Sequence, residues 1–69
     1  MPLHYKIETE LETDGRWIAE AVGLPGVLAY GQSEDDAIKY VEALALRVIA
    51  DRLENEEVPA RDMSVSFSV

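Results

Sequence analysis

The sequence contains no cysteine and a single histidine, His4. Without cysteine the chain can form neither a disulfide nor a thiolate metal site, and it has no cysteine nucleophile. A zinc site needs several His or Cys ligands, and this sequence offers only one. His4 is therefore interpreted as a solvated side chain. We therefore predict no metal site and no cofactor.

Basic residues are also scarce. Six Lys and Arg stand against 14 Asp and Glu, which gives a formal net charge of −8. Nucleic acids and anionic membrane surfaces are bound through basic side chains, so we predict no direct nucleic-acid binding and no membrane binding. A surplus of carboxylates instead suits a basic partner, most simply a basic protein.

Long apolar runs are absent as well. The longest uncharged stretch, 21–33, contains glycine and proline and is too short to span a bilayer. The N-terminus lacks the apolar segment of a secretory signal, so a cytoplasmic protein is expected. With 69 residues and 48% apolar side chains, we expect a single domain over 1–69 with one small core.

Strict alternation of apolar and polar residues over 3–12 predicts a half-buried strand. A three-residue hairpin loop at 13–15 then leads to a second strand at 16–22. This register puts Trp17 on the buried face and Ile18 on the other, whereas a two-residue loop would reverse both. On the buried face of the first strand we place Leu3, Tyr5, Ile7, Thr9 and Leu11.

A Gly-Leu-Pro-Gly turn at 23–26 predicts a short third strand at 27–30. Ser33 is expected to cap a helix whose first turn is acidic and which ends near 53–55. The helix carries an apolar stripe at helical spacing, made of Ala37, Ile38, Val41, Leu44, Ala45, Val48 and Ile49.

A polar loop around Pro59 leads to a last strand at 63–69. The order of elements predicts a two-layer α+β fold, β-β-β-α-β, in which one helix covers one face of a four-stranded sheet. The first three strands form an antiparallel meander, and a right-handed crossover through the helix makes the last strand parallel to the first. The expected sheet order is 3-2-1-4.

The polar face of the first two strands places Glu8, Glu10 and Glu20 around an exposed Ile18. An aliphatic side chain ringed by carboxylates suits a basic partner with an apolar centre, so these four residues form the predicted partner-binding surface. For the alternating carboxylates Glu8, Glu10 and Glu12, a solvated face is the favoured alternative, and a hard-cation or paired-carboxylate site is the other. We predict no catalytic residue, because the serines of the last strand have no base nearby in the pattern.

The last strand is uncharged and prone to β-structure, and the topology places it at an edge of the sheet. Unpaired N–H and C=O groups at such an edge can pair with another chain. We therefore predict a homodimer or tetramer, with the oligomer contact at Ser64, Val65, Ser66 and Phe67.

Three motifs occur in order: Gly15-Arg16-Trp17-Ile18-Ala19-Glu20, Leu24-Pro25-Gly26 and Gly31-Gln32-Ser33-Glu34-Asp35-Asp36-Ala37-Ile38. Together they resemble the HicB antitoxin family, whose members typically read G-x-aromatic-aliphatic, then D-L-P-G-C, then G-x-[ST]-x-x-[DE]-A-[LI]. The resemblance covers about residues 3–53, and the stretch 59–69 looks like the family's last strand. The sequence departs from the family pattern at Val22, Gly23 and Val27, where Pro, Asp and Cys are frequent.

The resemblance implies an antitoxin of a type II toxin–antitoxin system, which binds and neutralises a HicA-like toxin, a small basic RNA-cleaving protein. It also implies a fold similar to a truncated ribonuclease H core. HicB antitoxins usually continue into a DNA-binding segment, and because this sequence stops at Val69 we do not carry DNA binding over. The alternative is an orphan homo-oligomeric scaffold or adaptor domain. A metal-dependent nuclease is the third and least favoured hypothesis, and we predict no enzymatic activity.

Overall fold

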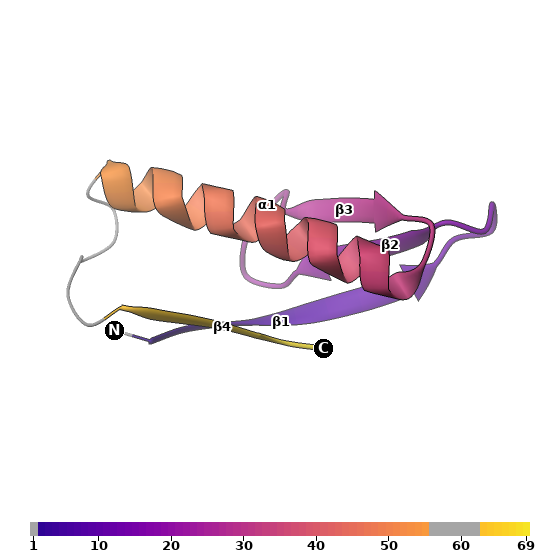
Figure 1. The fold of residues 1–69 in the computed structure, drawn as a ribbon, viewed down its shortest axis with the longest axis horizontal. Coiled ribbons are helices and arrows are strands. Elements are labelled where there is room, and N and C mark those ends of the chain that lie inside the picture. The colour runs from indigo at the N-terminus through magenta and orange to yellow at the C-terminus, as the bar shows by residue number, and fades with distance from the viewer. Residues whose placement is uncertain (1, 56–62) are drawn as a thin grey trace.

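The computed structural model describes residues 2–55 and 63–69, and the loop expected around Pro59 lies outside them. The elements follow in the order β1 (Pro2–Leu11), β2 (Trp17–Ala21), β3 (Leu28–Gly31), α1 (Glu34–Glu54) and β4 (Ser64–Ser68). The strands form one mixed sheet in the order β3-β2-β1-β4, and α1 packs against one of its faces (Figure 1). The predicted α+β architecture and sheet order are confirmed.

The β1–β2 hairpin has the register that a three-residue loop predicts. Leu11 lies opposite Trp17. The backbone N–H of Gly15 donates to the carbonyl of Glu12 at 3.0 Å, and that of Glu12 donates to the carbonyl of Arg16 at 2.7 Å. Gly15 has a φ of +90°, a left-handed conformation that glycine adopts without steric cost. The loop geometry therefore sets which side chains of β2 face the helix.

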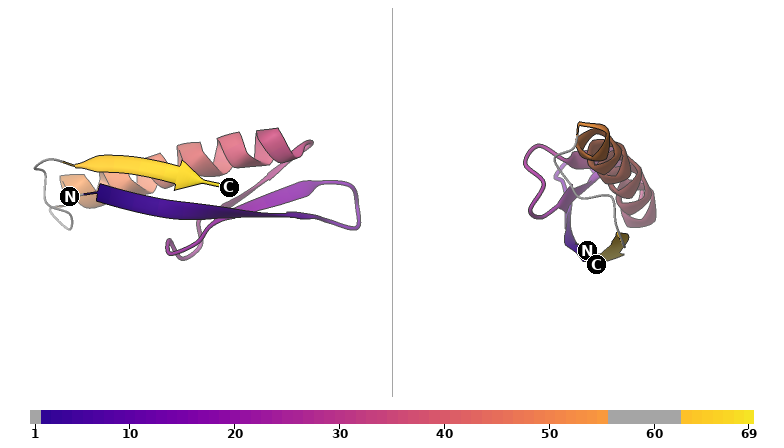
Figure 2. Two further views of the ribbon diagram at one scale, coloured as in Figure 1. Left: turned by 90° about the horizontal axis from the view of Figure 1, so that it is seen from below. Right: turned by 90° about the vertical axis from the view of Figure 1, so that its left-hand side faces the viewer.

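The last strand returns beside the first. β4 is parallel to β1, with His4 opposite Ser66 and Tyr5 opposite Phe67. Figure 2 shows the two strands side by side, starting at the same end of the molecule. The helix supplies the crossover that a parallel connection requires. The parallel pairing is thus confirmed, and the strand is one residue shorter at each end than predicted.

Helix α1 begins and ends with side-chain caps. The hydroxyl of Ser33 accepts a hydrogen bond from the backbone N–H of Asp36 at 3.1 Å, as expected of an N-cap. At the other end the backbone N–H and the side-chain Nδ2 of Asn55 both donate to the carbonyl of Asp51, at 3.1 and 2.8 Å. These caps satisfy backbone groups that have no partner inside the helix.

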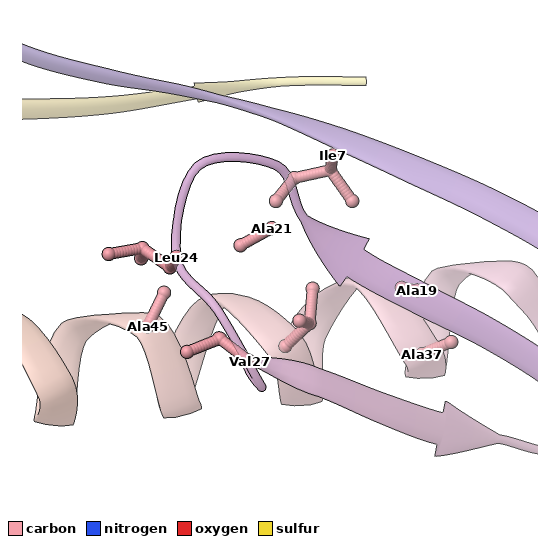
Figure 3. Close-up of a cluster of buried hydrophobic side chains, with 8 residues drawn as sticks. Ile7, Ala19, Ala21, Leu24, Val27, Ala37 and Ala45 are labelled. Atoms are coloured by element: carbon pink, nitrogen blue, oxygen red, sulfur yellow. The ribbon is translucent and has the colours of Figure 1, made fainter.

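The core lies between α1 and the sheet. Every fourth residue of the helix is buried there, which confirms the predicted stripe and places its other members at the margins. Leu24 and Val27, from the turn between β2 and β3, are also buried, although the sequence analysis treated them as turn and strand residues (Figure 3). The buried cluster consists of Ile7, Ala19, Ala21, Leu24, Val27, Ala37, Val41 and Ala45.

The prediction for Leu11 is wrong. Its side chain is 56% exposed, although its position in the alternating pattern put it on the buried face. The hydroxyl of Thr9 donates to a carboxylate oxygen of Glu34 at 2.7 Å, and Glu34 is the first residue of α1. Leu11 is two residues farther along β1 and lies past the start of the helix that covers the other apolar residues.

Gly31 lies directly against the backbone at the start of α1. A Cβ atom at this position would lie 2.9 Å from the Cα of Ala37 and would clash with its backbone nitrogen. These are backbone atoms of the first helical turns, so they cannot rotate out of the way. Gly31 is the last residue of β3, and its missing side chain allows the helix to lie close to this strand.

The helix does not cover the sheet evenly. It packs mainly on β3 and β2 and makes few contacts with β1. The strand pair β1–β4 is therefore the less covered part of the sheet. On this part of the helix-side face the apolar side chains Leu3, Tyr5, Val65 and Phe67 are half-buried. The rings of Tyr5 and Phe67 lie 6.2 Å apart between centroids. The sheet thus has a tightly covered half and a partly covered half.

Candidate functional site

The face of the sheet opposite α1, here called the open face, carries the predicted partner-binding residues. On β1 it presents Glu8 and Glu10, and on β2 it presents Ile18 and Glu20. Glu8 pairs directly with Glu20, and Glu10 pairs with Ile18. The three-residue hairpin loop is responsible, because it turns Trp17 towards the helix and leaves its neighbour Ile18 on the opposite face. The four predicted residues therefore lie together.

A shallow hollow of about 500 Å³ occupies this part of the open face. Ile18 and Leu28 supply apolar surface inside it, and carboxylates stand around them, with Lys6 as a single cation. The lining residues are Lys6, Ile7, Glu8, Thr9, Glu10, Ile18, Glu20, Leu28 and Val69. The hollow therefore combines an apolar centre with a predominantly negative rim.

Two apolar side chains of β3 on the open face, Leu28 and Tyr30, were missed by the sequence analysis. Leu28 pairs with Glu20 and Tyr30 pairs with Ile18, and both side chains are about 40% exposed, at 39% and 42%. The alternation within β3 could have indicated them, since they are separated by the helix-facing Ala29. Ile18 itself is half-buried, so the prediction that it is exposed is wrong, because its neighbours on β1 and β3 cover part of it. The apolar strip on the open face therefore runs from the half-buried Ile18 on β2 to the exposed Leu28 and Tyr30 on β3.

The apposed carboxylates of Glu8 and Glu20 are an electrostatic cost for the isolated fold. Side chains directly opposite one another on antiparallel strands have Cβ atoms about 4.5–5.5 Å apart, and like charges in such a pair repel. A cationic group placed between them would turn this repulsion into attraction. The arrangement therefore favours contact with positive charge.

Arg16 lies at the hairpin end of the sheet, outside the residues that line the hollow. Its guanidinium Cζ atom lies 4.3 Å from the centroid of the Tyr30 ring, a cation–π contact. The backbone N–H of Arg16 donates to the Asp14 carboxylate at 3.0 Å and the guanidinium Nε does so at 2.8 Å, and these bonds hold the pKa of the Asp14 carboxyl below its usual value. Arg16 is thus engaged by its own hairpin.

His4 is exposed, as predicted, but the expectation that the serines of β4 have no base nearby is wrong. The Nδ1 atom of His4 lies 2.8 Å from the hydroxyl of Ser66, and Nε2 lies 3.0 Å from that of Ser68. The parallel register of β1 and β4 brings these residues together, so the contact depends on a long-range pairing that spacing alone does not show. Both ring nitrogens of His4 lie within hydrogen-bonding distance of serine hydroxyls. In a catalytic pair, one nitrogen contacts the nucleophile and a third group orients the other. The arrangement around His4 differs from that pattern.

The predicted oligomer contact is at the edge of the sheet. β4 is the outermost strand next to β1, with Ser64 and Ser66 exposed on the open face. Val65 and Phe67 point to the helix side and are half-buried. The structure therefore places all four residues on one five-residue edge strand, as the sequence analysis expected.

Within residues 2–55 and 63–69, no three His, Asp or Glu side chains are grouped so that they could hold a metal ion. In the same part of the chain no helix is both long and apolar enough to cross a membrane. Comparison with known proteins finds no family model, no curated protein and no solved structure that matches this chain.

Proposed function

We propose that this protein is a HicB-like antitoxin of a type II toxin–antitoxin system, which binds and neutralises a small, basic, HicA-like RNA-cleaving toxin in the cytoplasm. The observation that carries the proposal is the open face, where three carboxylates surround the half-buried Ile18 and the exposed Leu28. The net charge of −8 supports it, because an acidic surface can cover the RNA-binding face of a basic protein.

The geometry suggests how a basic side chain would bind. A lysine or arginine carries an aliphatic stem that can lie on Ile18 and Leu28, and its charged head would then reach the carboxylates of Glu8 and Glu20. The apposed pair gains most from this contact, since its mutual repulsion is relieved at the same time. A basic partner with an apolar centre therefore matches this face in both shape and charge.

The test uses the double reversal Glu8→Lys and Glu10→Lys. Association with a HicA-like toxin encoded beside this chain should slow and lose much of its salt dependence, because charge at the rim of an interface mainly controls the association rate. Toxin-catalysed RNA cleavage should then continue in the presence of the variant. Stopped-flow binding and an RNA-cleavage assay measure the two effects.

The matched control is the double reversal Asp51→Lys and Glu54→Lys, which changes the net charge by the same amount on the last turns of α1. Cations are favourable at a helix C-terminus, so this variant should fold and bind like the wild type. Equal binding by both double variants would refute the assignment of the open face.

A second candidate, a homo-oligomeric scaffold or adaptor domain, is supported by the uncharged edge strand β4. The two candidates differ in their dependence on a toxin. A protein that forms oligomers but leaves the RNA cleavage of every neighbouring basic toxin unchanged would favour the scaffold.

A further inference from the structure

We infer that the β4 strands of two copies of this chain pair with each other, antiparallel and around a two-fold axis at Ser66. The pairing joins the two sheets into one continuous sheet of eight strands. It rests on the edge position of β4, on a self-complementary pattern of side chains and on the distribution of charge around the strand.

The side chains of β4 complement themselves in this register. When Ser66 lies opposite Ser66 of the second copy, Ser64 lies opposite Ser68 and Val65 lies opposite Phe67. Residues that face each other across an antiparallel pair share one face of the sheet, so hydroxyls meet hydroxyls and apolar groups meet apolar groups. This register also pairs all five residues of the strand, whereas centring on Val65 or Phe67 shortens the paired segment.

The charge distribution selects a second copy over a basic partner. The segments that form the β1–β4 pair, 2–6 and 64–68, contain no Asp or Glu and one basic residue, Lys6. The paired segments thus carry no carboxylate side chain in a chain with a net charge of −8. Two copies can approach along these segments with little repulsion, while a basic protein finds no Asp or Glu side chain on 2–6 or 64–68 to bind.

The surface beside this edge would also gain from being covered. Tyr5, Val65 and Phe67 are half-buried on the helix side because α1 packs mainly on β2 and β3. Pairing of the two β4 strands brings the two sets of apolar side chains next to each other and removes more of their area from water. A chain of 69 residues builds only a small core, so this additional burial is a substantial gain.

The two-fold axis through Ser66 is perpendicular to the sheet. Both copies of α1 then lie on one face of the joined sheet, and both open faces lie on the other. The carboxylates around Ile18 are on β1 and β2, away from the joined edges, and stay accessible. The dimer is therefore independent of the proposed toxin binding, and each can fail while the other holds.

The experiment uses two opposite charges at the two-fold centre. In the Ser66→Glu and the Ser66→Lys protein alike, two equal charges face each other across the axis, and we expect dimer affinity to fall at least about tenfold in each. An equimolar mixture of the two variants should recover a dimer, because opposite charges then meet. Sedimentation equilibrium at micromolar concentration gives the masses, and native mass spectrometry identifies the mixed dimer.

Ser66 is exposed, so both variants should fold, and far-UV circular dichroism checks this. Thr13→Glu and Thr13→Lys, in the exposed hairpin loop, are matched controls that should keep the wild-type mass. A monomeric wild-type protein at micromolar concentration would overturn the proposal. A dimer that neither Ser66 variant weakens, or a mixture of variants that stays monomeric, would equally overturn pairing centred on Ser66.

Discussion

The two halves of the sheet carry side chains of different size and are covered differently. Under α1, β2 and β3 contribute small residues such as Ala19, and the helix approaches until no side chain fits at Gly31. Beside them, β1 and β4 carry larger groups such as Tyr5 and Phe67, which stay half-buried. The helix thus completes the core on one side and leaves apolar surface at the other.

This difference shows where stability and association are located. Small side chains permit close packing of helix on sheet, and close packing brings the buried atoms into dispersion contact and excludes water between the layers. Large side chains at an edge hold the helix away and retain area that a second surface can bury. The covered half therefore accounts for the fold of one chain, and the β1–β4 half is available for contact with another.

The largest effect on stability is expected from Gly31→Ala, which places a methyl group between β3 and α1 in the covered half. Its methyl group would meet backbone atoms of Ala37, so the helix must move away from β3, and we expect a loss of about 3 kcal/mol or more in the free energy of unfolding. Urea denaturation measures the loss. Gly26→Ala is the control, because it has a φ of +78° but open space around it and should cost only about 1–2 kcal/mol. Equal losses in the two variants would contradict the close approach at Gly31.

A matched pair of truncations compares the two halves. Val41→Ala removes a fully buried side chain at 0% exposure and should lower the free energy of unfolding by about 2 kcal/mol. Val65→Ala makes the same chemical change at a half-buried position and should cost about 1 kcal/mol or less. Alanine has a higher helix propensity than valine, so the substitution in α1 recovers some stability. A larger loss at Val41 than at Val65 must therefore come from packing. A larger loss at Val65 would show that the β1–β4 half is the more important core.

The smallest effect concerns the open face. Glu20→Gln removes one of two apposed carboxylates and should raise the free energy of unfolding of the isolated protein by a few tenths of a kcal/mol, more at low salt. The same gain should disappear when Glu8 is already glutamine, because the repulsion it relieves is gone. Thermal denaturation of the two single variants and the double variant forms the required cycle, and additive effects would contradict direct repulsion.

Much of the fold and part of the candidate site follow from local patterns. The hairpin register follows from the loop length, and with it the opposite orientation of Trp17 and Ile18. The grouping of Glu8 and Glu20 on one face follows as well, since a strand alternates its side chains with period two. These features depend on residues close together in the chain, so the sequence predicts them correctly.

The features that were missed depend on where distant elements meet. His4 contacts Ser66 because a parallel crossover brings the two ends of the chain into register. Leu11 lies on the helix side of β1, as the alternating pattern predicts. It is nevertheless exposed, because α1 begins beside Thr9 and does not reach the end of the strand. Neither result can be derived from a pattern within one strand.

The sequence by itself determined the elements, their order and the acidic open face, because period, turn residues and caps act over a few positions. The sheet topology followed from that order, because a right-handed crossover through one helix makes the last strand parallel to the first. The tertiary structure alone decided how far α1 covers the sheet, through the close contact at Gly31 and the burial of Leu24 from a turn. Coverage depends on the distance between helix and strand, which the volumes of side chains from several elements set together. That distance leaves the β1–β4 half partly uncovered, and it is the physical basis for the association proposed at β4.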